Sequence, residues 1–255
     1  MKISAHYQQK NGGDPTVEWL LARCGVVTAS EFSSLVTPLG KVSEGKGVFT
    51  YLCEKLAERW IGGPLPSFYA FACEQGSILE EEAIPFAALE YNLDIQQVGF
   101  VSMDGTRVGC SPDGLIGFAG LSKDQPTDYK LTGSESGIEI KCPNLETHIK
   151  YLLKNELPAD YVAQVQGSMF VTGCKTWHFL SYRRHLPALH LVIERDEKYQ
   201  DALAVALESF NEQLDEAMEM LVKINGGLPD QKHRGNVPFT MPKPQPISDD
   251  LGATL

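Results

Sequence analysis

Two short segments carry residue types that could hydrolyse a phosphodiester with the help of a metal ion. One is the tetrapeptide SPDG, which contains Asp113, and the other is the tripeptide EIK, 26 residues further on. Successive residues of a strand alternate between its faces, so Glu139 and Lys141 point the same way while Ile140 points into the core. If the strand that ends at Asp113 lies beside the second segment, Asp113 and Glu139 converge as oxygen ligands for Mg²⁺ or Mn²⁺, and the Ile140 carbonyl completes the protein ligands.

A metal ion at this place would suit phosphodiester hydrolysis. It would stabilise charge on the phosphate and lower the pKa of the attacking water, and Lys141 would orient or deprotonate that water. A plainer interpretation exists, because a Pro-Asp-Gly turn and a strand with Glu and Lys on its solvent face are both common in proteins. The two segments by themselves leave both interpretations open.

A helical segment offers one more acidic candidate for the same site. In GSILEEEA at 76–83, Glu80 follows the small Gly76 by about one helical turn. From there it could join the metal directly or through water. We interpret Glu81 and Glu82 as a solvated acidic face.

The segment AQVQ at 163–166 offers two amide side chains. Residues two apart on a helix point about 200° away from each other. Only one of the two glutamines can therefore face the site. We expect it to be Gln164, and the alternative is that this residue is a surface amide.

Five segments of the chain stand in a recognisable order. They read ARCGVVTASEF at 22–32, GSILEEEA at 76–83, CSPDGL at 110–115, EIKCP at 139–143, and YVAQVQGSMFVTG with WHFLSY at 161–182. In type, order and spacing they resemble the phage lambda-type, or YqaJ-type, exonucleases of the PD-(D/E)xK nuclease superfamily, and the resemblance covers roughly residues 17–193. Five motifs in order are far more specific than the first two segments alone, so the nuclease interpretation is favoured.

The resemblance implies a Mg²⁺-dependent exonuclease that degrades one strand of linear double-stranded DNA processively from a 5′ end, within a ring-shaped homotrimer. It also implies a phage or prophage origin and, as partner, a single-strand annealing recombination protein that loads onto the exposed 3′ strand. Residue by residue, it implies that Asp113 and Glu139 are the metal ligands and that Lys141 is the catalytic lysine. It also implies that Glu80 is the family's helix glutamate and Gln164 its active-site glutamine. Arg23 and Ser30 match the family's 5′-phosphate pocket.

The proposed phosphate pocket also has a physical basis in the residues. Thr28 and Glu31 have the spacing of a capping box, which predicts that a helix begins at Thr28. The amides and the positive dipole end of such a helix favour an anion, and Ser30 could add a hydroxyl. Arg23, just upstream, could bind a phosphate with two hydrogen bonds. The alternative for Arg23 is a surface ion pair.

Two other functions remain open. An endonuclease of the same superfamily, directed to branches or nicks, would use the same metal chemistry. A non-catalytic DNA-end-binding protein could keep the fold, although it would have no need for two acids and a lysine at one metal.

The net charge of −11, from 22 basic and 33 acidic residues, argues at first against a nucleic-acid partner. However, residues 194–223 hold nine acidic and three basic side chains, a net of −6. More than half of the excess therefore lies on one predicted helix. Binding of DNA in a ring then requires that basic groups line an inner channel while acidic groups face outward.

Cysteine spacing and hydropathy exclude several classes of protein. The six cysteines stand singly and never as CxxC, so neither a zinc ribbon nor a clustered iron–sulfur site is indicated. No run of about 18 apolar residues exists, and the N-terminus lacks the apolar core of a signal peptide. We therefore expect a cytoplasmic protein without a membrane partner.

Helical and strand patterns alternate along the chain. Helices are predicted over 15–24, 28–35, 49–60, 74–91, 145–156, 159–171 and 196–225, with short strands around 98–117 and 137–142 and two more in TWHFLSY and LHLVIER. The pattern predicts an α/β or α+β fold with a central mixed sheet flanked by helices, and the resemblance implies a restriction-endonuclease-like core. We expect one nuclease domain over 1–227 and a Pro-rich, extended or disordered tail over 228–255.

Two further patterns are interpreted as decoys. GKVSEGK at 40–46 nearly matches a P-loop, but Gly47 replaces the Ser or Thr that would bind Mg²⁺, so we interpret it as a mobile loop able to touch DNA. His178, His185 and His190 lack the spacing of metal ligands and are interpreted as strand and turn residues.

Overall fold

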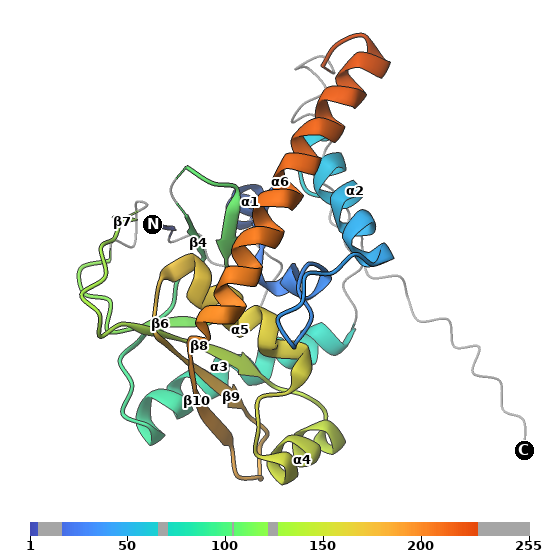
Figure 1. The fold of residues 1–255 in the computed structure, drawn as a ribbon. Coiled ribbons are helices and arrows are strands. Elements are labelled where there is room, and N and C mark those ends of the chain that lie inside the picture. The colour runs from blue at the N-terminus through green and yellow to red at the C-terminus, as the bar shows by residue number, and fades with distance from the viewer. Residues whose placement is uncertain (5–16, 66–70, 104, 122–126, 229–255) are drawn as a thin grey trace, which may run out of the picture.

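The computed structural model describes residues 1–4, 17–65, 71–103, 105–121 and 127–228. Its strands pair in two five-stranded mixed sheets (Figure 1). The first has the order β2-β5-β4-β1-β7, formed by Val27–Thr28, Val108–Cys110, Phe100–Ser102, Lys2–Ser4 and Thr127–Asp128. The second has the order β10-β9-β8-β6-β3, formed by Leu189–Glu194, Thr176–Ser181, Ser136–Lys141, Gly114–Ile116 and Ile95–Gln96.

Six α-helices and one 3₁₀ helix flank these sheets in the described residues. They are α1 (Val17–Arg23), the 3₁₀ helix η1 (Ala29–Ser34), α2 (Lys46–Ile61), α3 (Phe71–Glu90), α4 (Leu145–Lys154), α5 (Ala159–Thr172) and α6 (Glu197–Asn225). The expected class, mixed sheets flanked by helices, is confirmed. The strands divide between two sheets, where one central sheet was predicted.

The chain passes from the first sheet to the second at the SPDG segment. β5 ends at Cys110 and β6 begins at Gly114. Pro112 stands between them and has no N–H to donate to a ladder, so it ends the first pairing. β6 then runs antiparallel to β8, with Gly114 opposite Ile138. This register places Asp113 beside the segment that carries Glu139.

Helix α5 forms the centre of the molecule. It packs against η1, against β4 and β5 of the first sheet, and against β8 and β9 of the second. Its buried residues lie all around the helix, which is typical of a core helix. At Gly167 an added Cβ would lie 2.4 Å from the ring of Phe32 on η1, so this close approach requires glycine.

Helix α3 covers the second sheet with small side chains. Ala83 and Ala87 are fully buried against Ile138, Ile140 and Leu180 of β8 and β9. Pro85 lies inside α3. The side chain of Ile140 thus points into the core, as strand alternation required.

The long C-terminal helix confirms the prediction over 196–225. The Asp196 side chain accepts hydrogen bonds from the amides of Lys198 and Tyr199, and Gly226 ends the helix at φ +73°. Its buried stripe includes Leu203, Leu207, Phe210 and Leu214, and it packs against α2 and α5 (Figure 1). Its acidic residues from 208 to 219 are exposed.

The predicted capping box is wrong. Residues 29–34 form a 3₁₀ helix, and the Thr28 side chain makes no capping bond. Thr28 is instead held in the β2–β5 ladder opposite Gly109, and its amide donates to the hydroxyl of Tyr51 at 3.0 Å. Because the backbone of Thr28 is fixed in this way, the residue is not free to cap a helix.

Several other expectations can be compared with the structure. β4 and β5 pair antiparallel, in agreement with the short strands expected around 98–117; Asp104, between them, lies outside the described residues. Residues 122–126, and residues 229–255 of the predicted tail, also lie outside them. Among the described residues, no helix combines the length and hydrophobicity that a membrane crossing requires.

Candidate active site

Asp113, Glu139 and Lys141 come together at the start of β6 and the end of β8. Asp113 Oδ2 accepts a hydrogen bond from the Ile140 amide at 2.6 Å. Lys141 Nζ lies 2.6 Å from Glu139 Oε1, and also lies over the ring of Tyr161, 5.1 Å from its centroid. The structure therefore confirms that the two sequence segments lie side by side and that Glu139 and Lys141 share one face.

The two glutamines of α5 point to different places. Gln164 Nε2 donates to Glu139 Oε1 at 2.6 Å. Gln166 Nε2 instead donates to the Glu194 carbonyl at 2.9 Å, near the start of α6. Helix geometry thus separates them as expected, and Gln164 is the one that contacts the cluster.

The cluster holds more negative than positive charge. Burial and the nearby carboxylates of Glu139 and Glu80 raise the pKa of Asp113 well above its usual range. Burial also raises the pKa of Glu80, and the charge of Glu139 adds to this while Lys141 opposes it. Burial by itself would lower the pKa of Lys141, but the charges of Glu139 and Asp113 outweigh it and raise the pKa. Three carboxylates therefore share one ammonium, which is an arrangement that attracts a cation.

One carboxylate oxygen provides a specific test of whether a metal ion fits. Glu139 is only 2% exposed, and among the described residues its Oε2 atom has no hydrogen-bond partner. A buried oxygen without a partner is costly, and a cation bound to it would remove that cost. Mg²⁺ prefers carboxylate oxygens and keeps several waters. No group of three or more His, Cys, Asp or Glu in the described residues could hold an ion, so such a metal would depend on Asp113, Glu139, backbone oxygen and water.

Arg23 forms a second polar site with two hydroxyls. Its Nη1 donates to Ser111 Oγ at 2.9 Å and its Nη2 to Ser30 Oγ at 3.4 Å. Its guanidinium lies over the ring of Trp19, 4.3 Å from the centroid. We call Arg23, Ser30 and Ser111 the arginine pocket. Ser30 is exposed and also contacts Thr28 Oγ1 at 3.3 Å.

Sequence reasoning missed Ser111. The signal was its position directly before Pro112 and Asp113, which places the arginine pocket two residues from the carboxylate cluster. Burial lowers the pKa of Arg23, but a guanidinium stays charged in proteins. In the part of the chain that the structure describes, no carboxylate pairs with it directly. An anion in this pocket would be bound by these side chains and not by the N-terminus of a helix, because η1 has only six residues and lacks the predicted cap.

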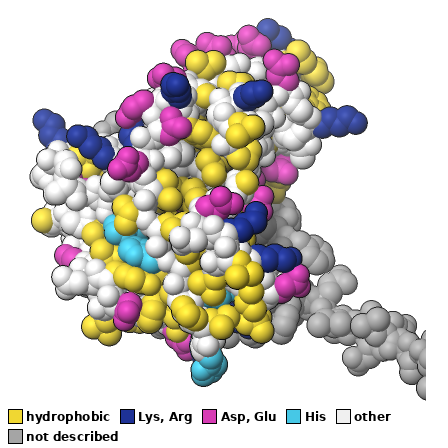
Figure 2. All heavy atoms as spheres, turned by 60° about the horizontal axis from the view of Figure 1, so that its bottom comes forward, with side chains coloured by type: hydrophobic (Ala, Val, Ile, Leu, Met, Phe, Trp, Pro, Cys, Tyr) yellow, Lys and Arg dark blue, Asp and Glu magenta, His cyan; other side chains and the backbone are white. Residues whose placement is uncertain are grey.

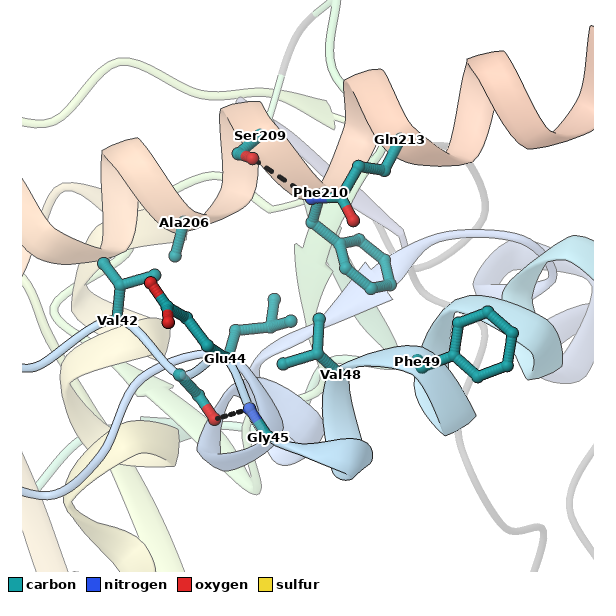
Figure 3. Close-up of a pocket in the computed structure, with 11 residues that line it drawn as sticks. Val42, Glu44, Gly45, Val48, Phe49, Ala206, Ser209, Phe210 and Gln213 are labelled. Carbon is teal, nitrogen blue, oxygen red and sulfur yellow. Dashed lines mark hydrogen bonds between the residues drawn. The ribbon is translucent and has the colours of Figure 1, made fainter.

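The glycine-rich loop at 40–46 borders a pocket of a different kind. A pocket of about 450 Å³ lies between this loop, the start of α2 and α6, and the side chains of Val48 and Phe210 point into it (Figure 3). Of the described residues that line it, Glu44 is charged and none is Lys or Arg. This lining does not suit a phosphate, in agreement with the rejection of the P-loop.

The histidines lie on strands and a turn, as interpreted from the sequence. His178 Nδ1 and His190 Nε2 are 2.8 Å apart, and the ring of Tyr91 stacks on His190. Burial, and then the charge of His190, lowers the pKa of His178 to about 4. His185 lies in the turn between β9 and β10, at φ +66°. Histidine side chains lie among hydrophobic ones on the face shown in Figure 2.

Comparison with known proteins agrees with this geometry. The YqaJ-like viral recombinase domain model matches residues 18–175. ExoD of Escherichia coli (strain K12) is 44% identical over 61 residues, which are 23% of this chain and 70% of ExoD. Structures of LHK-Exo, an alkaline exonuclease from Laribacter hongkongensis, one of them in complex with dAMP, match with a TM-score of 0.69 and 27% identity over 83% of this chain and 98% of theirs.

A more distant structure shows likeness of fold alone. A phage-related exonuclease from Haemophilus somnus 129PT has a TM-score of 0.50 and 15% identity, over 75% of this chain and 96% of that one. The family match covers more than half of the chain and includes Arg23, Asp113, Glu139 and Lys141. The chain therefore belongs to the family of the YqaJ-like viral recombinase domain.

Proposed function

We propose that this chain is a Mg²⁺-dependent exonuclease that degrades one strand of linear duplex DNA from a 5′-phosphorylated end, processively and in the 5′-to-3′ direction. The observation that carries the proposal is the convergence of Asp113, Glu139 and Lys141 around a buried carboxylate oxygen that lacks a partner among the described residues. The family of the chain and its likeness to an alkaline exonuclease support a DNA exonuclease.

The residues of the cluster would divide the reaction among them. Asp113 and Glu139, with the Ile140 carbonyl, would hold Mg²⁺ or Mn²⁺, which when bound stabilises charge on the phosphate and lowers the pKa of a water. Without a metal ion, the charges of Glu139 and Asp113 raise the pKa of Lys141. Lys141 would orient or deprotonate the attacking water. Gln164 holds Glu139 in one orientation through its bond to Oε1.

Glu80 and the arginine pocket would contribute to metal binding and to the placement of the DNA end. Glu80 interacts electrostatically with Asp113 and would contact the metal directly or through water. Arg23, with the hydroxyls of Ser30 and Ser111, offers a charged fork and two neutral groups to a terminal 5′ phosphate. Because Ser111 and Asp113 are two residues apart, a phosphate held in the arginine pocket would bring the end of the strand close to the metal ligands.

The proposal extends to the partners implied by the resemblance. They are duplex DNA ends, two further copies of the chain in a ring-shaped trimer, and a single-strand annealing protein that takes up the 3′ strand for recombination. A cytoplasmic location is part of the same proposal.

One digestion experiment tests the activity. A single duplex sequence is prepared as a linear 5′-phosphorylated form, a linear 5′-hydroxyl form and a covalently closed circle, each with Mg²⁺ and with EDTA. We expect rapid loss of the phosphorylated linear form alone, abolished by EDTA. Cutting of the circle would indicate an endonuclease of the same superfamily, and no cutting of any form would indicate a DNA-end-binding protein; either result contradicts the proposal.

A further inference from the structure

We infer that Arg59 and Arg107 form a second phosphate-binding site, in which Asp215 of α6 stands in for the phosphate when no ligand is bound. The chemical class of ligand is a phosphate group. A backbone phosphate of the DNA substrate is the expected source, and this choice of source rests on the proposed function. The site is separate from the arginine pocket and from the carboxylate cluster.

Three elements bring the charged groups together. Arg59 near the end of α2 and Arg107 just before β5 both contact the same atom, Oδ1 of Asp215; the Arg59 Nη1 contact is 3.1 Å. Together with Val26 and Met218, these residues line a pocket of about 330 Å³. Two guanidinium groups share one carboxylate, so the group of three keeps one surplus positive charge.

Arg59 has an unused donor inside this group. Its side chain is only 13% exposed, and in the described part of the chain its buried Nη2 has no hydrogen-bond partner. Its Nε donates to the Gly25 carbonyl at 3.1 Å, which fixes the orientation of the planar group. A buried cationic donor without a partner is costly. A phosphate, with several oxygens, can accept bonds from both guanidinium groups at once, whereas Asp215 accepts both at a single oxygen.

The carboxylate of Glu58 is occupied by other partners. Glu58, one residue before Arg59, uses its Oε2 atom to accept from the Gly25 amide at 2.8 Å and from Lys55 Nζ at 2.9 Å. Among the described residues, the carboxylate that contacts both guanidinium groups is Asp215, whose side chain is 56% exposed. The arrangement is therefore a positive site with a displaceable counter-ion.

A single turn connects this site with the arginine pocket. Gly25, at φ +67°, follows Arg23 by two residues, and an added Cβ there would lie 2.7 Å from Arg59 Cγ. Arg107 directly precedes β5, and Ser111 directly follows it. The two residues are four positions apart, which is roughly 13 Å along an extended chain. Both sites thus depend on the same two strands, β2 and β5, and are far enough apart to bind different phosphates.

Binding measurements on the full chain test the inference. A fluorescent 5′-phosphorylated duplex is titrated with protein in EDTA, which prevents cleavage, at several salt concentrations. Because Arg107 is half exposed, Arg107→Gln should fold; we expect about five- to tenfold weaker binding and a salt slope lower by about one. Asp215→Asn should instead bind several-fold tighter, since the resident carboxylate is removed. Glu216→Gln removes the same charge from an exposed neighbour on α6 and serves as the matched control.

Opposite effects of the two variants would support the site, because a purely structural ion pair predicts loss in both. A second arm uses inorganic phosphate alone: a rise in Tm that Arg107→Gln abolishes, with DNA binding unchanged, would support the site and assign it to a free phosphate. If Asp215→Asn binds DNA no tighter than Glu216→Gln and phosphate raises no Tm, the inference is wrong. Cleavage by the wild type in Mg²⁺ is measured in parallel, so failure of the proposed function is seen separately.

Discussion

The carboxylate cluster and the arginine pocket lie two residues apart along the chain, yet they are opposite in charge. The cluster gathers the carboxylates of Glu80, Asp113 and Glu139 around a single ammonium; Glu139 is buried and the other two are half-buried. The arginine pocket holds one guanidinium against neutral hydroxyls. Each region is therefore incomplete by itself.

The difference shows what each region requires. A surplus of negative charge is relieved by a cation. Arg23 bonds to two hydroxyls and has no carboxylate partner among the described residues, so it keeps its charge for an anion. A DNA strand end with a metal ion supplies both. Removing a charged side chain from the cluster should therefore affect metal-dependent cleavage, whereas removing one from the arginine pocket should affect the use of 5′-phosphorylated ends.

The largest effect should come from the cluster. Glu139→Gln keeps the shape of the side chain but removes the charge that would hold the metal. Metal-assisted stabilisation is worth several kcal/mol, so we expect cleavage of phosphorylated linear duplex to fall about 10³-fold or more. Initial rates of nucleotide release measure this. Binding of the same duplex in EDTA should be retained, because the arginine pocket is untouched.

The thermal stability of this variant provides an independent check. Mg²⁺ should raise the Tm of the wild type, because an ion that binds only the folded state stabilises it by about 2.7 kcal/mol at a hundredfold excess over Kd. Glu139→Gln should lose most of this rise. An equal rise in both proteins would show that the ion binds elsewhere.

The next effect should come from the arginine pocket. Arg23→Ala removes charge-assisted hydrogen bonds worth about 1.5–3 kcal/mol, so digestion of 5′-phosphorylated ends should fall roughly 10- to 100-fold. Digestion of 5′-hydroxyl ends should change little. Arg184→Gln, which removes an exposed arginine paired with Glu82, is the control for loss of charge. Equal losses on both kinds of end would contradict a 5′-phosphate pocket.

A smaller effect on activity should come from a substitution that displaces the strand of the cluster and leaves the arginine pocket in place. At Gly137 on β8, an added Cβ would lie 2.2 Å from the ring of Trp177. Gly137→Ala should therefore destabilise the protein by about 1–3 kcal/mol and displace the strand that carries Glu139. Urea unfolding measures the loss, and Gly47→Ala, where a Cβ meets nothing within 4 Å, is the control. Cleavage activity should fall more than the binding of phosphorylated ends in EDTA. A larger loss of binding than of cleavage would contradict the view that the cluster and the arginine pocket act separately.

The sequence predicted the cluster better than the pocket, for a physical reason. Strand alternation and helix periodicity are local rules, and they placed Glu139 and Lys141 on one face and separated Gln164 from Gln166. Ser111 was missed because its contact with Arg23 joins residues 88 positions apart.

The error at residues 28–35 has a similar origin. The capping-box pattern is local, but the β-ladder with Gly109 and the hydroxyl of Tyr51 hold Thr28 in an extended conformation. Both partners are distant in sequence. The division of the strands into two sheets likewise depends on pairing that no local pattern contains, such as β1 with β7.

The smallest effect should lie outside both regions, at the histidine pair of β9 and β10. The pKa of His178 is lowered to about 4, whereas an unfolded histidine titrates near 6.5. Between these values the unfolded state binds the extra proton. The contribution of His178 to stability is therefore fully present above about pH 6.5 and is lost as the pH falls toward 4.

Urea midpoints at pH 7 and pH 5 should therefore differ less in His178→Gln than in the wild type. His185→Asn, at an exposed turn position whose positive φ suits asparagine, should keep the wild-type difference. If His178→Gln keeps it as well, the acid sensitivity arises at another group, such as His190, whose pKa burial also lowers. The carboxylates of Asp113 and Glu80 cannot cause it, because their raised pKa values favour the folded state as the pH falls.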